Sequence, residues 1–161
     1  MSVYHNITSW LSEQEISFKN LQHPPTYTSE QSAEYRGEAL SVGAKAIVYK
    51  IEKAYYLFVL PANRNLDTKK IKQYFKDQGR KAKKTRFATP EELDTLTGLV
   101  PGSVPPFGPP ILEMELFVDE AILQNEKVAF NAGSLTDSVI MSRADYVEMA
   151  KGTMFDFSIE K

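Results

Sequence analysis

The stretch of this chain best suited to chemistry is residues 98–110, Gly-Leu-Val-Pro-Gly-Ser-Val-Pro-Pro-Phe-Gly-Pro-Pro, which holds five of the nine prolines and three of the eight glycines. Proline fixes its own φ and removes a backbone donor, whereas glycine permits positive φ and lets a ligand approach the main chain. We therefore expect a stiff loop of defined shape. On composition alone a connector between two parts of a sheet is modestly favoured, because most clusters of proline and glycine are turns.

Residue types argue against several other kinds of chemistry. The chain has no cysteine, which removes disulfides, thiolate nucleophiles and cysteine-based metal sites. It has two histidines, His5 and His23, so a zinc site is not expected. No serine lies in a nucleophile-elbow pattern, which argues against a serine hydrolase. We expect no metal and no cofactor, so catalysis would use other side chains and the backbone.

Positive charge is concentrated in one part of the chain, although the formal net charge is −2. Between residues 69 and 86 there are nine basic residues against one acid, a local balance of +8 that leaves −10 for the rest. A patch of this kind can bind a phosphate backbone through counterion release. A solvated helix face followed by a basic loop explains the same residues equally well.

The length of 161 residues, 42% of them hydrophobic, fits one compact domain over residues 1–161. No apolar run approaches the ~20 residues that a membrane span needs, and the first residues lack the pattern of a secretion signal. We therefore expect a cytoplasmic protein that does not act at a membrane.

Hydrophobic periodicity and capping signals predict an alternation of helices and strands. Helices are expected over residues 7–14, 28–36, 67–78, 89–97 and 142–150, and strands over residues 16–21, 44–51, 55–60, near 87, 112–118, 128–131, 138–141 and 154–159. The hairpin over residues 44–60 has the strongest strand signal. The pattern indicates an α+β fold with a curved, mixed, mostly antiparallel and barrel-like sheet flanked by helices.

Three pieces of the sequence resemble a known family when taken in order. They are Lys45 within residues 43–49, the loop at residues 98–108, and Asn131-Ala132-Gly133 in a later hairpin. Together they resemble the YbaK/prolyl-tRNA synthetase-associated editing domains over nearly the whole chain. The element Gly-Leu-x-Pro-Gly-x-x-x-Pro-Phe-Gly is specific, whereas the lysine and the Ala-Gly pair are weak when taken alone. The resemblance implies hydrolysis of the ester of a mischarged aminoacyl-tRNA, for example alanine or cysteine on proline tRNA.

Carried over residue by residue, the resemblance makes Lys45 the family's essential lysine. Gly102 and Pro106 fall on its Gly-x-x-x-Pro loop, and Ala132 and Gly133 on its small-residue turn. Two segments depart from the family pattern: Lys45 is followed by alanine and isoleucine, and the segment after Gly133 lacks the acidic pattern of the YbaK branch. These departures bear on amino-acid specificity more than on the fold, and they leave Asp137 and Ser138 as further candidates.

An aminoacyl ester is already activated, so an enzyme needs to place a water, stabilise the oxyanion and hold the terminal adenosine. The backbone amides of the loop suit the oxyanion, with Gly102 and Lys45 as catalytic candidates. Lys45 would bring its charge to the terminal phosphate or the oxyanion; alternatively it is an ordinary strand-edge lysine. The expected substrate-binding residues also include a larger set: Ser103, Val104, Pro105, Pro106, Phe107, Asn131, Ala132, Gly133, Tyr27, His23 and Ser138.

Three of these expectations keep an alternative. Tyr27 and Phe107 either stack on the terminal adenine or serve as rim and core packing. His23 either lines the pocket or is structural, and the second is favoured. Contacts to the acceptor stem are assigned to three lysines of the basic stretch, Lys81, Lys83 and Lys84.

The leading hypothesis is a metal-independent deacylase that clears mischarged tRNA in trans, with docking on an aminoacyl-tRNA synthetase left open. The contrasting hypothesis is a non-catalytic module that kept the fold and binds a nucleotide or an aminoacyl group.

Overall fold

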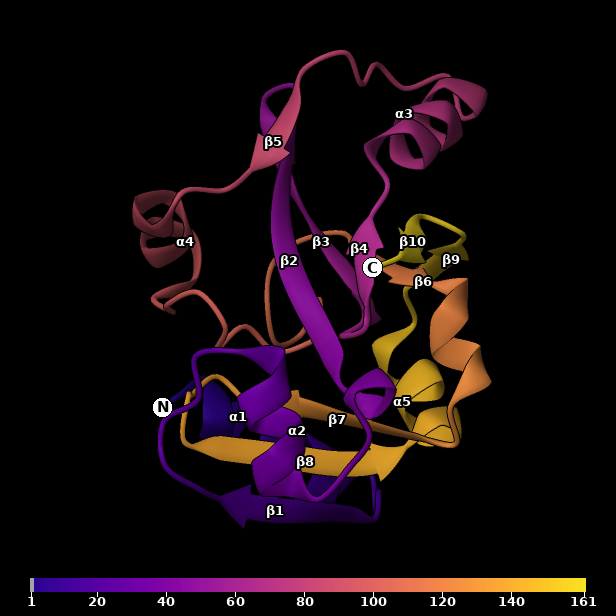
Figure 1. Cartoon of the computed structure of the whole chain (residues 1–161). Helices are drawn as coiled ribbons and strands as arrows, with labels where there is room; N and C mark the ends of the chain where they lie inside the picture. Colours follow the sequence, from indigo (N-terminus) through magenta and orange to yellow (C-terminus); the bar gives the residue numbers. More distant parts are fainter. Residues whose placement is uncertain (1) are drawn as a thin grey trace.

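The computed structural model describes residues 2–161, which form five α-helices and ten strands in three sheets (Figure 1). The helices are α1 (Val3–Glu13), α2 (Ser29–Arg36), α3 (Thr68–Asp77), α4 (Pro90–Thr97) and α5 (Arg143–Ala150). The strands are β1 (Phe18–Gln22), β2 (Ala44–Ile51), β3 (Ala54–Pro61), β4 (Arg64–Leu66), β5 (Thr85–Phe87), β6 (Leu116–Asp119), β7 (Lys127–Asn131), β8 (Asp137–Ser142), β9 (Thr153–Phe155) and β10 (Ser158–Glu160). The fold is therefore α+β, as predicted.

The central sheet is mixed, with the strand order β5-β2-β3-β6-β9. Its first three strands are antiparallel, and β6 and β9 add to it in parallel. A second, antiparallel sheet of order β1-β8-β7 lies across the lower end of β2 in Figure 1, and β4 pairs with β10 in a third. The isolated bridge between Gly43 and Ala129 joins β2 to β7. No closed barrel is found in residues 2–161, so the barrel-like character that we expected for the sheet is not confirmed.

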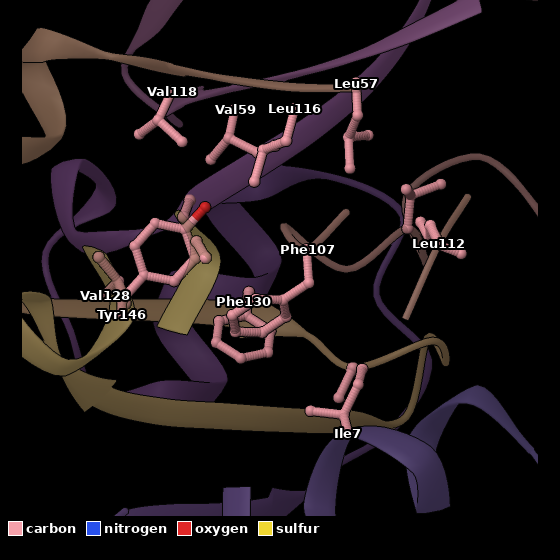
Figure 2. Packing of buried hydrophobic residues seen from close by; sticks show 14 of the residues in the cluster. Ile7, Leu57, Val59, Phe107, Leu112, Leu116, Val118, Val128, Phe130 and Tyr146 are labelled. Atoms are coloured by element: carbon pink, nitrogen blue, oxygen red, sulfur yellow. The ribbon is translucent and has the colours of Figure 1, made fainter. Parts of the chain in front are cut away.

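Both faces of the central sheet are buried, which follows from the alternation of apolar residues along its strands. On one face Tyr49, Phe58 and Leu60 pack with α3. On the other face the main cluster includes Leu57 and Val59, together with residues of α1, α5, β7 and the loop at residues 98–110. Figure 2 shows Phe107 of that loop beside Phe130 and Tyr146. The core therefore holds the loop in place.

The strongest local signals of the sequence are confirmed. Thr89 and Glu92 form a reciprocal capping box at the start of α4, and Gly98 ends this helix with φ +72°. The predicted hairpin is present as β2 and β3, with Ala44 opposite Pro61 at its open end. Such signals involve neighbours in the chain, so they do not depend on tertiary contacts.

Three predicted elements are wrong in extent. The strand expected over residues 112–118 begins only at Leu116, because the amides of Ile111 and Leu112 both donate to Gly108 O and fold this segment into a turn. The strand expected over residues 154–159 is broken into β9 and β10, where the buried Asp119 carboxylate accepts hydrogen bonds from Phe157 N and Ser158 Oγ. The first helix begins at Val3 rather than at residue 7 because Ser2 caps it.

Candidate active site

A pocket of about 240 Å³ lies where the lower end of β2 meets α2 and the loop at residues 98–110. Its walls come from three parts of the chain that are far apart in sequence. The lining residues are Thr26, Tyr27, Thr28, Ser29, Ser32, Arg36, Gly43, Ala44, Lys45, Ala46, Ile47, Ala62, Gly102, Val104 and Asn131. None of them carries a carboxylate, whereas two carry a positive charge.

The first wall is an open edge of β2. On that side β5 pairs only with Tyr49, Lys50 and Ile51, so residues 44–47 pair with β3 alone and have no second strand partner among the described residues. Lys45 lies in this segment and is half-buried. The pKa of Lys45 is lowered to about 8, mainly by burial and also by the charge of Lys161, while the carboxylate of Glu30 opposes the shift. The amine is therefore mainly charged at neutral pH but readily loses its proton.

The second cation is Arg36, the last residue of α2. Its Nη2 donates to Asn131 Oδ1 at 3.0 Å, and its Nε donates to Ser138 Oγ at 2.9 Å. No salt bridge to Arg36 is present in residues 2–161, and burial lowers its pKa to about 10, which leaves it charged at neutral pH. Two cations with no acid in the lining favour an anionic ligand.

The third wall is the loop itself, which is fixed through the backbone. Gly102 has φ +87°, a conformation that glycine adopts at little cost. Asn131 Nδ2 donates to Gly102 O at 2.7 Å, and Gly133 N donates to Ser103 O at 2.9 Å. The amides of Gly102 and Val104 donate to no described residue. Both residues line the pocket, and neither amide is used in a hydrogen bond within the described fold.

The side chain of Asn131 connects the arginine to the loop. Its oxygen accepts from Arg36 and its nitrogen donates to Gly102 O, so its orientation is determined at both ends. Ser138 lies behind it, fully buried, with Oγ 2.8 Å from His23 Nε2. The ring of His23 also stacks on Tyr35. His23 and Ser138 therefore support the pocket from behind and do not line it.

The structure brings together five of the residues predicted for the site: Tyr27, Lys45, Gly102, Val104 and Asn131. Most of the other loop and turn residues are buried behind the pocket wall, and they include Ser103, Pro105, Pro106, Phe107 and Ala132. Gly133 contributes its amide to the loop but is not in the lining. Asp137, at the start of β8, is likewise outside it.

Phe107 is a core residue, which was one of the two roles that the sequence left open. Its ring is 0% exposed and packs edge-on against Trp10 and Phe130. The Tyr146 hydroxyl donates to Pro106 O at 2.7 Å beside it. No face of the Phe107 ring is free for a base, so its prediction as an adenine-stacking residue is wrong. Tyr27 at the rim is 76% exposed and can offer a face.

The basic stretch lies at the opposite end of β2 from Lys45. Lys81, Lys83 and Lys84 immediately precede β5, which pairs with the last three residues of β2. Ile51 lies six positions along the strand from Lys45, a distance of roughly 20 Å. Lys81 approaches Glu52 at 3.5 Å, and elsewhere in the stretch Arg80 pairs with Glu115. The charge balance read from the sequence is thus reduced by acids from distant segments.

The pocket residues that sequence reasoning missed include Arg36, Thr26 and Ser32. Arg36 resembled an ordinary basic residue in the last turn of a helix, which is common for dipole reasons. Thr26 and Ser32 resembled polar residues around a helix start. Only the packing of α2 against the second sheet places all three at a shared wall.

The chain was compared with known proteins. A family model described as the aminoacyl-tRNA editing domain matches residues 23–149. The chain belongs to this family. A Multifunctional Ser/Thr-tRNA deacylase ProXp-y from Escherichia coli (strain K12) is 33% identical over 164 residues, covering 97% of this chain and 93% of that protein. The resemblance found in the sequence is confirmed, and so is the expectation that this aminoacyl-tRNA editing domain is a deacylase.

Two further comparisons extend the relationship. The Proline--tRNA ligase of Thermotoga sp. (strain RQ2) is 31% identical over 96 residues, which cover 60% of this chain and 16% of that protein. A solved structure described as a candidate trans-editing enzyme for prolyl tRNA synthetase superposes on this editing domain with a TM-score of 0.81 at 24% identity. That match covers 99% of this chain and 98% of the other, and it shows the shared fold.

Within residues 2–161, no group of three or more histidine, aspartate or glutamate side chains is placed to hold a metal ion. None of the helices described for the editing domain is both long enough and apolar enough to cross a membrane.

Proposed function

We propose that this protein hydrolyses the ester of a tRNA mischarged with serine or threonine, acting in trans. The observation that carries the proposal is the meeting of Lys45 with the free amides of Gly102 and Val104 in one pocket without a carboxylate. The amino-acid class is supported by the Escherichia coli relative, which is aligned over nearly its whole length and is named a Ser/Thr-tRNA deacylase.

The chemistry assigned to the pocket is direct attack by water. The water oxygen bonds to the ester carbonyl carbon, and negative charge develops on the carbonyl oxygen. Collapse breaks the bond between that carbon and the ribose oxygen, which takes the proton that the attacking water gives up, and the amino acid leaves. The amides of Gly102 and Val104 are the proposed oxyanion donors, and such donors contribute most when fixed in advance. Asn131 and Arg36 fix them by anchoring the loop.

Lys45 is proposed to bring its charge to the terminal phosphate or to the oxyanion. A covalent intermediate on Ser138 is not part of the mechanism, because that hydroxyl is fully buried and already contacts Arg36 and His23. Tyr27 at the rim is the proposed stacking surface for the terminal adenine, since an exposed aromatic face accepts any unpaired base.

The decisive experiment is a deacylation assay over a panel of tRNAs charged with serine, threonine, alanine, cysteine and proline. Serine and threonine esters are expected to be cleaved fastest. If the folded wild-type protein binds these tRNAs but cleaves none of them, the hypothesis of a non-catalytic binding module replaces that of a deacylase. Preferential cleavage of alanine or cysteine esters would support the deacylase activity but contradict the assignment of serine and threonine as the amino acids removed.

The rate of deacylation is expected to fall as the pH rises through about 8. Burial lowers the pKa of Lys45 to about 8, so the ammonium that serves the reaction is lost above that pH. The enzyme-dependent kcat/KM, after subtraction of spontaneous ester hydrolysis, should decrease by up to about tenfold per pH unit beyond the pKa. The Lys45→Arg variant supplies the baseline, because arginine stays charged. Identical profiles for the two proteins would show that the Lys45 charge is not required.

Lys81, Lys83 and Lys84 are proposed to contact the acceptor stem of the tRNA. Reversing all three to glutamate should weaken tRNA binding and lower the slope of log Kd against log salt by up to about three, roughly one for each phosphate contact. The titration is run from 50 to 300 mM salt, with charge reversal of Lys19 and Lys151, exposed lysines outside this stretch, as the control. A slope that stays at the wild-type value would make the basic stretch an ordinary solvated surface.

A further inference from the structure

A pair of buried hydroxyl groups forms the inner end of the pocket. Thr26 is 2% exposed and Ser32 is 5% exposed, and both line the cavity. Ser32 Oγ donates to Thr26 Oγ1 at 2.8 Å. By contrast, Tyr27 at the rim is 76% exposed. The pocket therefore runs from an aromatic rim to a polar floor.

The fold leaves part of the hydrogen-bonding capacity of this pair unused. Each hydroxyl has one hydrogen and two acceptor lone pairs. Ser32 uses its hydrogen on Thr26, but the Thr26 hydroxyl donates to no described residue, and Ser32 Oγ accepts from none. Burying hydroxyl groups is costly unless they are partnered. A buried pair that still offers one donor and one acceptor toward a cavity suits a ligand with the complementary groups.

The shape of the pocket indicates which part of the substrate reaches this pair. At about 240 Å³ the pocket is below the usual range of roughly 300–1,000 Å³ for sites that enclose a small molecule. The larger adenosine must then stay toward the rim, where Tyr27 offers its ring. The amino-acid side chain, the smallest part of the ester, is therefore the part expected to reach the buried Thr26 and Ser32.

We propose that Thr26 and Ser32 determine the amino-acid specificity by hydrogen bonding to the side-chain hydroxyl of the substrate. This inference rests on the proposed deacylase function. An alcohol is both donor and acceptor, so one hydroxyl can accept from Thr26 and donate to Ser32. The neighbouring Thr28 does not compete, because its hydroxyl caps α2 by accepting from Gln31 N.

Substrate side chains that lack a hydroxyl cannot hydrogen-bond to Thr26 and Ser32, and alanine and valine differ in whether a water can do so instead. Alanine is small enough to leave room for a water, so it loses only part of the interaction. Valine has the shape of threonine but would cover both hydroxyls with methyl groups and leave them unpaired, which sites of this kind reject strongly. The expected order of kcat/KM is therefore serine and threonine first, alanine next and valine last.

The test compares seryl and alanyl esters on one tRNA with the variants Thr26→Val and Ser32→Ala. Each substitution should lower kcat/KM for the seryl ester about 10- to 100-fold and change that for the alanyl ester less than about threefold. Thr8→Val is the control, because it removes a half-buried threonine hydroxyl on α1, bonded to Tyr4 O, outside the pocket.

The double variant Thr26→Val/Ser32→Ala distinguishes a change in specificity from a loss of folding in the single variants. Removing one hydroxyl leaves its buried partner unpaired and should lower the midpoint of thermal unfolding. Removing both replaces the pair with apolar groups of similar shape, so the midpoint should return to near the wild-type value. A folded double variant that keeps the wild-type preference for serine overturns the specificity assignment, while the deacylase function stands.

Failure of the function itself gives a different result. If wild-type protein cleaves neither ester, the affinities of non-hydrolysable 3′-seryl-amide and 3′-alanyl-amide adenosine are measured instead. A preference for the seryl analogue that is lost in the double variant supports the assignment of Thr26 and Ser32 without catalysis. Equal affinities in the wild-type protein overturn it.

Discussion

Replacing Lys45 with methionine is expected to lower kcat/KM for deacylation at least about a hundredfold while leaving the fold no less stable than the wild type. Removal of a single group that stabilises developing charge typically costs 10²- to 10³-fold in rate. Methionine preserves most of the length of the side chain and its contacts along β2, so the lost rate reports the charge.

The expected stability of Lys45→Met follows from the linkage between protonation of Lys45 and folding. The pKa of Lys45 is lower in the folded protein than in the unfolded chain, because burial disfavours the ammonium. The charged lysine therefore opposes folding below pH 8, and this effect disappears as the pH rises beyond the unfolded value of about 10.5. Methionine has no charge to desolvate.

Urea denaturation and single-turnover deacylation should be measured on the same preparations at pH 7. Lys19→Met is the matched control, because Lys19 is exposed on β1. A Lys45→Met variant that is folded and active contradicts the assignment of a catalytic charge to Lys45, and one that is unfolded at equilibrium contradicts the stability expected from linkage.

The second large effect is expected for Asn131→Asp, which changes one atom of the link between Arg36 and the loop. The new carboxylate can still accept from Arg36, but it cannot donate to Gly102 O, which lies 2.7 Å from the present nitrogen. Two oxygens at that distance repel, so the loop must move away and carry the amides of Gly102 and Val104 with it. We expect a loss of about 100-fold, mainly in kcat, because a positioned donor matters most in the transition state.

A matched control for Asn131 exists elsewhere in the chain. Asn125 Nδ2 donates to the backbone oxygen of Ser41 at 2.9 Å, the same kind of bond outside the candidate active site. Asn125→Asp should lower stability by about 1 kcal/mol, as Asn131→Asp should, yet leave deacylation within about threefold of the wild type. Equal losses of activity in both variants would mean that Asn131 acts only through general stability.

The parts of the site that could be predicted from the sequence are those determined by neighbouring residues. Lys45 falls in a hairpin with a clear alternation of apolar residues, and Gly102 in a loop whose prolines exclude regular structure. That Lys45 and Gly102 share one pocket is a hypothesis that rests on the resemblance of these motifs, taken in order, to the editing-domain family. The structure places both in its lining together with Asn131.

The remaining features depend on contacts between distant segments. Arg36 belongs to the site because α2 packs beside Asn131 and Ser138, residues about a hundred positions later. Leu112 and Met114 are buried as the alternation predicts, but the turn at Gly108 buries them without forming a strand. Periodicity records which residues are buried, and cannot distinguish a strand from an irregular segment that packs against the same core.

The open edge of β2 has a consequence for how this protein behaves at high concentration. Residues 44–47 present unpaired backbone groups beside the pocket, and such edges can recruit a strand from another molecule. Natural sheets often protect an edge with a charged side chain, and Lys45 occupies this one. The group proposed for catalysis would then also keep the protein monomeric. Lys45→Met should remain folded in dilute solution but self-associate more readily than the wild type as concentration rises, which light scattering can measure.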